Sequence, residues 1–272
     1  MVNLLLAALF GVLEGVSEWL PVSSTGHLIL LRRFVDFPVR DEFFALFQVV
    51  IQLAAIGAVM LLFRHRLNPF ARHTMARERA DVWRLWRMVL LATLPSALVG
   101  LLLDDFLDAH LYRATVVALA LIFYGVLFLV LEKTRKRTPC IGKTSDIGMR
   151  QAVLVGVFQT LALIPGTSRS GATVLGGMFV GLSRPVAAEF SFFLGIPTML
   201  GASLLKCVKF FWSGNALSLE ELGMLLVGML TAFCCSLVTI RVLLDFVRRH
   251  TFAVFGVYRI LLGVAVLCTL FV

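Results

Sequence analysis

Long apolar runs with few charges constrain this chain more than any other feature. Several reach the roughly 20 residues that an α-helix needs to cross a bilayer. Of the 272 residues, 60% are hydrophobic and only 15% are charged, and the mean hydropathy is +0.94. A soluble domain of this length needs more polar surface to cover its core. The sequence therefore predicts an all-α polytopic membrane protein with a single membrane domain over residues 1–272.

Apolar length and basic loops together predict the topology. We expect six crossings, at about 43–63, 84–103, 114–131, 187–210, 221–243 and 251–271. The first connection is rich in arginine, from Arg64 to Arg87, and is expected to be cytoplasmic, whereas the next carries Asp104, Asp105 and Asp108. The alternation continues and places both termini outside. The exceptions to this pattern are Arg32, Arg33 and Arg40.

Two other apolar stretches, residues 3–34 and 150–182, are interrupted by segments rich in Pro, Gly and Ser. Such residues end a helix. Irregular backbone at membrane depth is tolerated only where it is buried in protein or lines a wet cavity. Each stretch is therefore predicted to be a re-entrant helix–loop–helix.

The two halves of the chain, about 1–135 and 146–272, resemble each other. An offset of 145 residues superposes Gly11 on Gly156, Glu14 on Gln159, Ser23 on Ser168, Thr25 on Ser170 and Gly26 on Gly171. Each half holds one broken stretch and three crossings, and because three is odd the second half must be inverted relative to the first. Inverted repeats with broken helices place their site near the bilayer midplane. The two breaks are therefore expected to face one cavity.

Composition also argues against several other classes of protein. The net charge of +9 lies at the ends of apolar segments, which is typical of topology signals and not of a nucleic-acid-binding surface. Five cysteines, with no CxxC pair, predict neither a disulfide framework nor a zinc site. The first residues lack a basic n-region, so no cleavable signal peptide is expected.

Glu14 and Glu18 are four residues apart, so on a helix both carboxylates lie on one face. Acids inside an apolar segment are costly and usually functional. Two like charges favour a bound cation or a proton held by one of them. The alternative is that both are exposed to headgroups or water at a helix end.

The first break continues with hydroxyls beside an imidazole, in Ser23, Ser24, Thr25 and His27. A hydroxyl next to a histidine is the minimum for an activated nucleophile. Ser/Thr/Gly clusters also cap helices, so the pattern alone is weak. The two nearby acids strengthen it.

The second break combines glycines, hydroxyls and one arginine at the start of a helix: Gly166, Thr167, Ser168, Arg169, Ser170, Gly171 and Thr173. Helix N-termini bind phosphate, and arginine presents a planar fork that matches phosphate oxygens. The alternative is an Arg169 side chain that snorkels to the interface. Four further polar residues are candidates for a supporting role or for simple bridging between helices, namely Gln48, Gln52, Glu189 and Ser191.

These motifs, 14–27, 165–173 and 189–194, resemble those of the BacA/UppP family of undecaprenyl-pyrophosphate phosphatases, and the resemblance spans essentially the whole chain. It implies an enzyme of the bacterial inner membrane that hydrolyses undecaprenyl pyrophosphate to undecaprenyl phosphate, recycling the lipid carrier for cell-wall synthesis. It also implies a link to bacitracin resistance, a site facing the periplasm and a divalent cation, Mg²⁺ or Ca²⁺. Gln48 departs from the family, in which an acid is common there.

By this resemblance Ser24 is the candidate nucleophile and His27 its proton partner. Glu14 and Glu18 would serve metal binding or proton transfer, and Arg169 would hold the pyrophosphate with the hydroxyls around it. The residues leave open whether serine, histidine or an oriented water attacks. They also leave the oligomeric state open, a homodimer being one option.

The competing hypothesis is a transporter or flippase of a polyprenyl phosphate. Inverted repeats and broken helices are general transporter architecture, and a carrier could use the same phosphate site without hydrolysis. A purely structural membrane protein leaves two polar motifs at bilayer depth unexplained.

Overall fold

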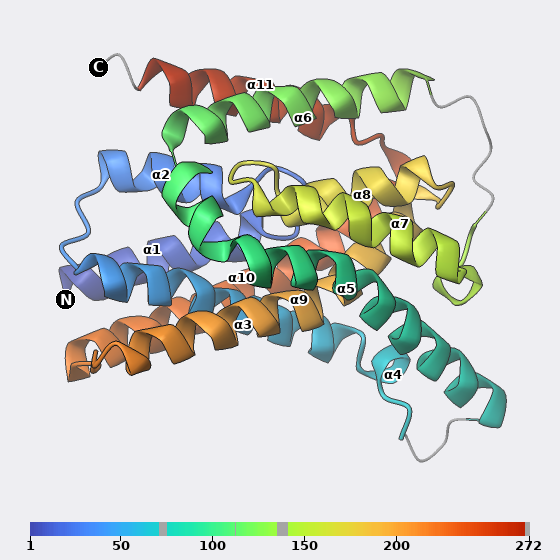
Figure 1. Cartoon of the computed structure of the whole chain (residues 1–272), viewed down its shortest axis with the longest axis horizontal. Coiled ribbons are helices and arrows are strands. Elements are labelled where there is room, and N and C mark those ends of the chain that lie inside the picture. Colours follow the sequence, from blue (N-terminus) through green and yellow to red (C-terminus); the bar gives the residue numbers. More distant parts are fainter. Residues whose placement is uncertain (71–74, 112, 135–140, 270–272) are drawn as a thin grey trace.

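The computed structural model describes the chain except residues 71–74, 112, 135–140 and 270–272, and it also leaves out the side chains of Asp104, Asp105 and Asp108. Arg72 and Cys140 therefore lie outside the described residues. The helices are α1 (Val2–Ser17), α2 (Ser24–Phe34), α3 (Asp41–Leu62), α4 (Arg64–Leu67), α5 (Ala76–Leu111), α6 (Ala114–Thr134), α7 (Met149–Thr160), α8 (Arg169–Phe179), α9 (Arg184–Trp212), α10 (Leu219–Arg249) and α11 (Ala253–Cys268), with short 3-10 turns η1 (Thr144–Asp146) and η2 (Leu161–Leu163) (Figure 1).

Among the described residues, five helices are long and apolar enough to cross a bilayer: α3, α5, α6, α9 and α10. They correspond to the first five predicted crossings and confirm a multi-pass helical membrane protein. The sixth predicted crossing, 251–271, corresponds to α11, which has 16 residues and is shorter than those five. α11 packs against α6, and the two helices lie side by side in Figure 1.

Both broken stretches form pairs of short helices. α1 and α2 are separated by residues 18–23, and α7 and α8 by η2 and a loop that ends at Ser168. The two N-caps match: Ser23 and Ser168 both have φ 71°, and each side chain accepts a hydrogen bond from a glycine N–H three residues on. A non-glycine residue in this region costs about 1–3 kcal/mol and persists only where its surroundings fix it. The two loops are therefore held by the rest of the fold.

The segment before α7 and the segment after α8 are joined by backbone hydrogen bonds. The Ser183 N–H donates to the Ile141 carbonyl at 2.9 Å, and the Ile141 N–H donates to the Gly181 carbonyl at 3.3 Å. Figure 1 shows both loops near the centre, with α2 and α8 running away from them in opposite directions. The chain thus reaches the middle of the molecule from one end with α1 and from the other with α7.

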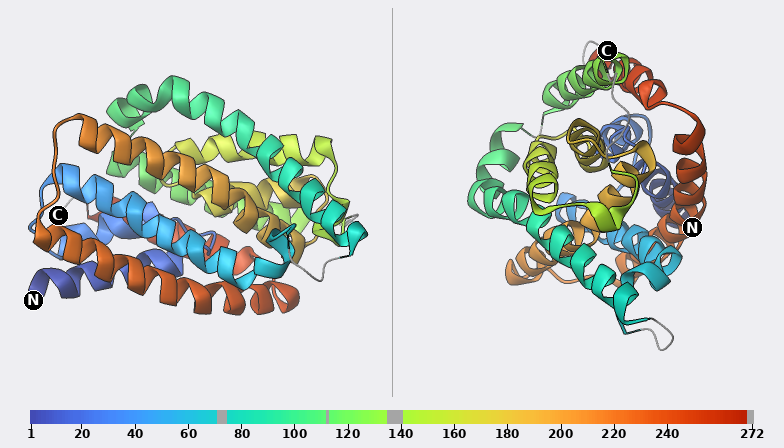
Figure 2. Two further views of the ribbon diagram at one scale, coloured as in Figure 1. Left: turned by 90° about the horizontal axis from the view of Figure 1, so that it is seen from below. Right: turned by 90° about the vertical axis from the view of Figure 1, so that its right-hand side faces the viewer.

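Small residues let helices from the two halves approach closely. A Cβ on Gly11 would lie 2.3 Å from the Gly228 carbonyl oxygen, and one on Gly156 would lie 2.3 Å from that of Ala92. α1 therefore packs on α10, and α7 packs on α5. Gly125 and Gly256 make the same kind of contact between α6 and α11. Figure 2 shows α8 enclosed by the surrounding helices, and the loop residues Trp19, Ser23 and Thr167 are also buried.

Candidate active site

One carboxylate joins the two broken motifs. Glu18, just after α1, accepts a hydrogen bond from the Ser24 hydroxyl at Oε2 (2.9 Å) and from Arg169 Nη2 at Oε1 (2.9 Å). All three groups are buried or nearly so, since the Arg169 and Glu18 side chains are 11% and 8% exposed. Residues 145 positions apart in the sequence are thus within the span of one carboxylate. This places the predicted nucleophile and the predicted phosphate ligand together.

Ser24 and Arg169 also occupy the same place in the two motifs, as the first residue of α2 and of α8. The side chains of Ser23 and Ser168 satisfy one N–H group of each helix, on Gly26 and Gly171. The preceding N–H groups of each first turn have no intrahelical acceptor. Two helix N-termini and a guanidinium therefore create positive potential around one carboxylate, which is the environment that a phosphate prefers.

The Arg169 guanidinium is anchored on α9. Its Nη1 donates to the Ser191 carbonyl at 2.7 Å, and its Nη2 lies 3.3 Å from the Met199 sulfur. Gly195 makes this room, because a Cβ there would lie 2.7 Å from Nη1. The guanidinium lies 5.6 Å from the Trp19 ring centroid. Arg169 thus turns inward instead of snorkelling to an interface.

The predicted hydroxyls connect the two loops. Ser170 Oγ donates to the carbonyls of Glu18 and Leu20, at 2.9 and 3.1 Å, and lies 3.2 Å from Ser168 Oγ. Thr173 is 2.6 Å from the Ser191 hydroxyl. Ser170, Thr173 and Ser191 therefore fix the helices and leave little capacity for a ligand.

The neighbouring Gly166 and Thr167 differ from these hydroxyls. Gly166 has φ 91°, and a Cβ there would lie 2.5 Å from the Val117 carbonyl oxygen, so only glycine fits. Thr167 is fully buried, and its hydroxyl has no hydrogen-bond partner among the described residues. This hydroxyl, two residues before Arg169, has the Tyr124 side chain as its polar neighbour.

Glu14 is fully buried, and its carboxylate faces Gln52 and Glu18 without a hydrogen bond of good geometry among the described residues. It lies beside Glu18 and Gln52, with Gln48 one turn earlier on α3. Within the described part of the chain, no three His, Cys, Asp or Glu side chains gather as a metal site. Two carboxylates are therefore the most that these residues offer a cation here.

His27 is not brought to Ser24. Its Nδ1 lies 2.7 Å from the Ser23 carbonyl and its Nε2 lies 2.7 Å from the Tyr258 hydroxyl on α11, whose ring it stacks against. Because a carbonyl only accepts, Nδ1 carries a proton, and a neutral ring then accepts from Tyr258. The hydrogen bond of Ser24 goes to Glu18 instead. Thr25 is half-buried on the same turn.

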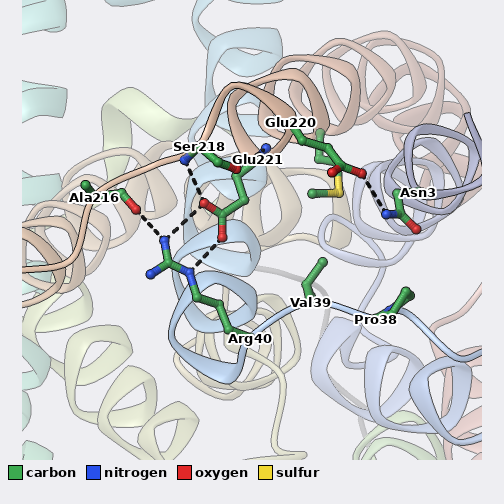
Figure 3. A pocket seen from close by; sticks show the side chains of 9 residues that line it. Asn3, Pro38, Val39, Arg40, Ala216, Ser218, Glu220 and Glu221 are labelled. Carbon is green, nitrogen blue, oxygen red and sulfur yellow. Dashed lines mark hydrogen bonds and ion pairs between the residues drawn. The ribbon is translucent and has the colours of Figure 1, made fainter.

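Glu189 lies apart from this cluster. It pairs with Arg66 at 2.9 Å, beside a cavity of about 1000 Å³ that is also lined by His65, Lys143 and Arg248. A second cavity, of about 440 Å³, lies around Arg40 and Glu221 at the ends of α3 and α10 (Figure 3). Neither cavity contains Ser24 or Arg169 among its lining residues.

Several residues around the site were missed at the sequence level, namely Trp19, Gly195, Met199, Tyr258 and Arg259. Apolar and glycine residues carry no signal in an apolar chain. Arg259 did carry one, since it is a lone charge inside a predicted crossing, and such residues are functional candidates.

Comparison with known proteins identifies the family. A family model described as "Bacitracin resistance protein BacA" matches residues 7–265. The chain belongs to the BacA family. A relative from Enterococcus faecalis named undecaprenyl-diphosphatase is 49% identical over 96% of this chain and 95% of its own length. Proteins of the same name from Acetivibrio thermocellus and Streptococcus thermophilus are also 49% identical, each over 98% of this chain and over 97% and 93% of their own lengths. Matches of this extent cover both broken motifs of this BacA-family chain.

Proposed function

We propose that this BacA-family protein hydrolyses undecaprenyl pyrophosphate to undecaprenyl phosphate and inorganic phosphate. The names of its relatives support this reaction and give no support to transport without hydrolysis. The observation that carries the proposal is the Glu18 carboxylate, which bonds the Ser24 hydroxyl and the Arg169 guanidinium at once. A nucleophile, an acceptor for its proton and a cation for phosphate oxygens are thereby in direct contact.

In the proposed mechanism the terminal phosphoryl group replaces Glu18 as the partner of Arg169. Ser24 Oγ attacks the terminal phosphorus in line, its proton passes to Glu18, and the bond to the bridging oxygen breaks to release undecaprenyl phosphate. Water then cleaves the serine phosphate and phosphate leaves. The contact between Ser24 and Glu18 favours Glu18 over His27 as the proton acceptor.

Charge stabilisation is the larger requirement of phosphoryl transfer. Arg169 supplies a positive fork that is fixed on the Ser191 carbonyl, so it needs little reorganisation. The first N–H groups of α2 and α8 and the buried Thr167 hydroxyl supply neutral donors. These groups would bind the oxygens of both phosphates.

The residues fit one divalent cation. The carboxylate oxygens of Glu14 beside Glu18 are donors of the kind that Mg²⁺ prefers. Mg²⁺ usually takes one or two protein carboxylates and completes its shell with phosphate oxygens and water, whereas Ca²⁺ takes more protein ligands. Glu14 and Glu18 would hold it, and it would neutralise charge on the pyrophosphate.

The membrane arrangement is part of the proposal. The matching N-caps, and the pairing of α1 with α10 and of α7 with α5, support an inverted repeat with two re-entrant hairpins. Figure 1 places both loops about midway along the long helices, consistent with a site near the midplane. The arginine-rich residues around α4 support a cytoplasmic end there, and α1 and α2 then open to the outside of a bacterial inner membrane.

The test is phosphate release from undecaprenyl pyrophosphate by purified protein in detergent. We expect Ser24→Ala to abolish it. The matched control is Ser203→Ala on α9, since Ser203 is also buried but donates to the Val49 carbonyl at 2.8 Å and not to Glu18. Full activity in Ser24→Ala would contradict the serine mechanism, and an inactive wild-type protein would contradict hydrolysis.

A further inference from the structure

Arg259 is an arginine buried at 0% exposure in the otherwise apolar helix α11. Its hydrogen bonds go to backbone carbonyls: Nη1 donates to Pro21 (3.1 Å), and Nη2 donates to Gly166 (2.9 Å) and Thr167 (2.8 Å). The ring of Tyr124 lies 5.8 Å from its guanidinium. One side chain from a third helix therefore ties the first broken motif to the second.

The carbonyls that it binds lie directly before the two functional helices. Pro21 is in the loop that leads to Ser24, and Gly166 and Thr167 are in the loop that leads to Arg169. The guanidinium also abuts the first turn of α8, since a Cβ on Gly171 would lie 3.0 Å from Nη1. The separation of the two loops is thus set by the width of a single planar group.

A buried cation is an expensive way to stabilise a fold, because apolar residues of similar volume often do so as well or better. Its planar fork can instead hold several acceptors in one fixed geometry. Among the described residues, the loop before Ser24 has two other polar links to the second motif, through Ser170 Oγ and through the ion pair of Glu18 with Arg169, but neither of them holds the backbone at Pro21. Arg169, by contrast, is anchored independently on α9. Loss of Arg259 should therefore displace Ser24 more than Arg169.

We propose that Arg259 is a positioning residue of the phosphatase, which sets the distance between the attacking Ser24 oxygen and the phosphate held by Arg169. The inference rests on the proposed function. Arg259 acts through backbone carbonyls and does not touch the substrate. Its removal therefore slows the chemical step and leaves substrate binding nearly unchanged.

The experiment compares kcat and KM for phosphate release by Arg259→Lys, Arg259→Met and a matched control, Arg184→Met. Arg184 also uses its guanidinium to bind more than one acceptor, but it is partly exposed and binds the Glu132 carboxylate at the C-terminal end of α6. A misplacement of about 1 Å can cost about a hundredfold in rate, so we expect kcat to fall about tenfold or more in Arg259→Lys and about a hundredfold in Arg259→Met. KM should stay within about threefold, because the Arg169 anchor remains. Arg184→Met should lower thermal stability and keep kcat per folded protein.

Two results would contradict a positioning role of Arg259. Normal kcat in Arg259→Lys would overturn the positioning role, as would a raised KM at constant kcat, which would indicate direct contact with substrate. If Arg259→Met does not fold, Gly171→Ala, which crowds the same guanidinium, replaces it and should show the same loss of kcat. If kcat falls as much in Arg184→Met as in the Arg259 variants, the loss reflects lower stability of the fold and not the position of Ser24. Absence of phosphate release by the wild-type protein is a separate result, which would contradict the proposed function itself.

Discussion

The two broken motifs share a backbone but differ in charge. At equivalent positions in α1 and α7 stand Glu14 and Gln159. Gln159 is satisfied, since its Nε2 donates to Ser96 Oγ at 2.6 Å and its Oε1 accepts from Thr198 at 3.4 Å. Within the described part of the chain, the buried Glu14 carboxylate faces Gln52 and Glu18 without a hydrogen bond of good geometry. The polar side chain is thus well paired in the second motif and poorly paired in the first, which supports the proposed role of Glu14 as a ligand of a cation.

The same contrast separates the starts of α2 and α8. Ser24 and Arg169 are equivalent first residues, and Glu18, which joins them, corresponds to Leu163 in the second motif. The nucleophile and its acid come from one copy and the cation from the other. In the proposed mechanism, the backbone that the two motifs share is the scaffold, and the few positions at which they differ carry the chemistry. Substitutions that make the two motifs alike at these positions should therefore lower the phosphatase activity.

The largest effect is expected for Glu18→Leu, which gives the first motif the residue of the second, and for its milder form Glu18→Gln. Either change removes the acceptor of the Ser24 proton and the partner of Arg169. General acid–base groups contribute about 10²–10⁴-fold, so kcat should fall about a thousandfold in Glu18→Gln. Phosphate release, with folding checked by thermal melting, is the measurement. A loss below about tenfold would assign the proton to another group.

Substitutions of Arg169 come next, with Arg169→Lys and Arg169→Ala separating charge from shape. Lysine keeps the charge but loses the fork that spans Glu18 and the Ser191 carbonyl. One lost contact of this kind costs roughly 3 kcal/mol, so Arg169→Lys should lose about a hundredfold in rate and Arg169→Ala more. The matched control is Arg66→Lys, because Arg66 also bridges a glutamate and an oxygen, but at the Glu189 cavity. Near-normal activity of the lysine variant would show that the positive charge of Arg169 is sufficient and that its planar fork is not needed.

The sequence predicted the helical membrane class, the five long helices and the two breaks, because apolar length and Pro/Gly punctuation are local signals. It also selected Ser24, Glu18 and Arg169, since polar residues are conspicuous in an apolar chain. It did not predict that Ser24 would bond Glu18 and that His27 would turn to Tyr258. Those partners depend on how α11 and the loops pack, which spacing along the chain does not encode. Glu189 was a candidate for a supporting role or for bridging between helices, and its side chain pairs with Arg66 beside a separate cavity.

A tenfold change in kcat is expected when Glu14 of α1 is replaced by glutamine, the residue at the equivalent position of α7. Glu14→Gln should reduce kcat about tenfold and weaken the response to Mg²⁺, because one of two carboxylates is lost. It should also raise the melting temperature of the metal-free protein, since a poorly paired buried acid is replaced by an amide. Activity is measured across a Mg²⁺ titration, alongside thermal melting.

The reciprocal change, Gln159→Glu, is its control. It should lower stability by about 1–3 kcal/mol through the lost donation to Ser96, with kcat per folded protein kept. An unchanged Mg²⁺ response in Glu14→Gln would return that acid to a structural role.

The smallest effect concerns His27, whose counterpart in α8 is Ala172. If the Tyr258 contact reflects the working state, His27 only braces the first turn of α2, and His27→Ala should cost about tenfold or less, far below Glu18→Gln. Tyr258→Phe should then change kcat by about fivefold at most, because a single neutral hydrogen bond contributes about 1 kcal/mol. If instead His27 swings to Ser24 during turnover, releasing it from Tyr258 should raise kcat, and His27→Ala should approach the loss seen in Glu18→Gln. Measuring the two single variants and their double variant separates these cases. A brace gives a double variant no slower than His27→Ala, whereas a faster Tyr258→Phe would reassign the proton to histidine.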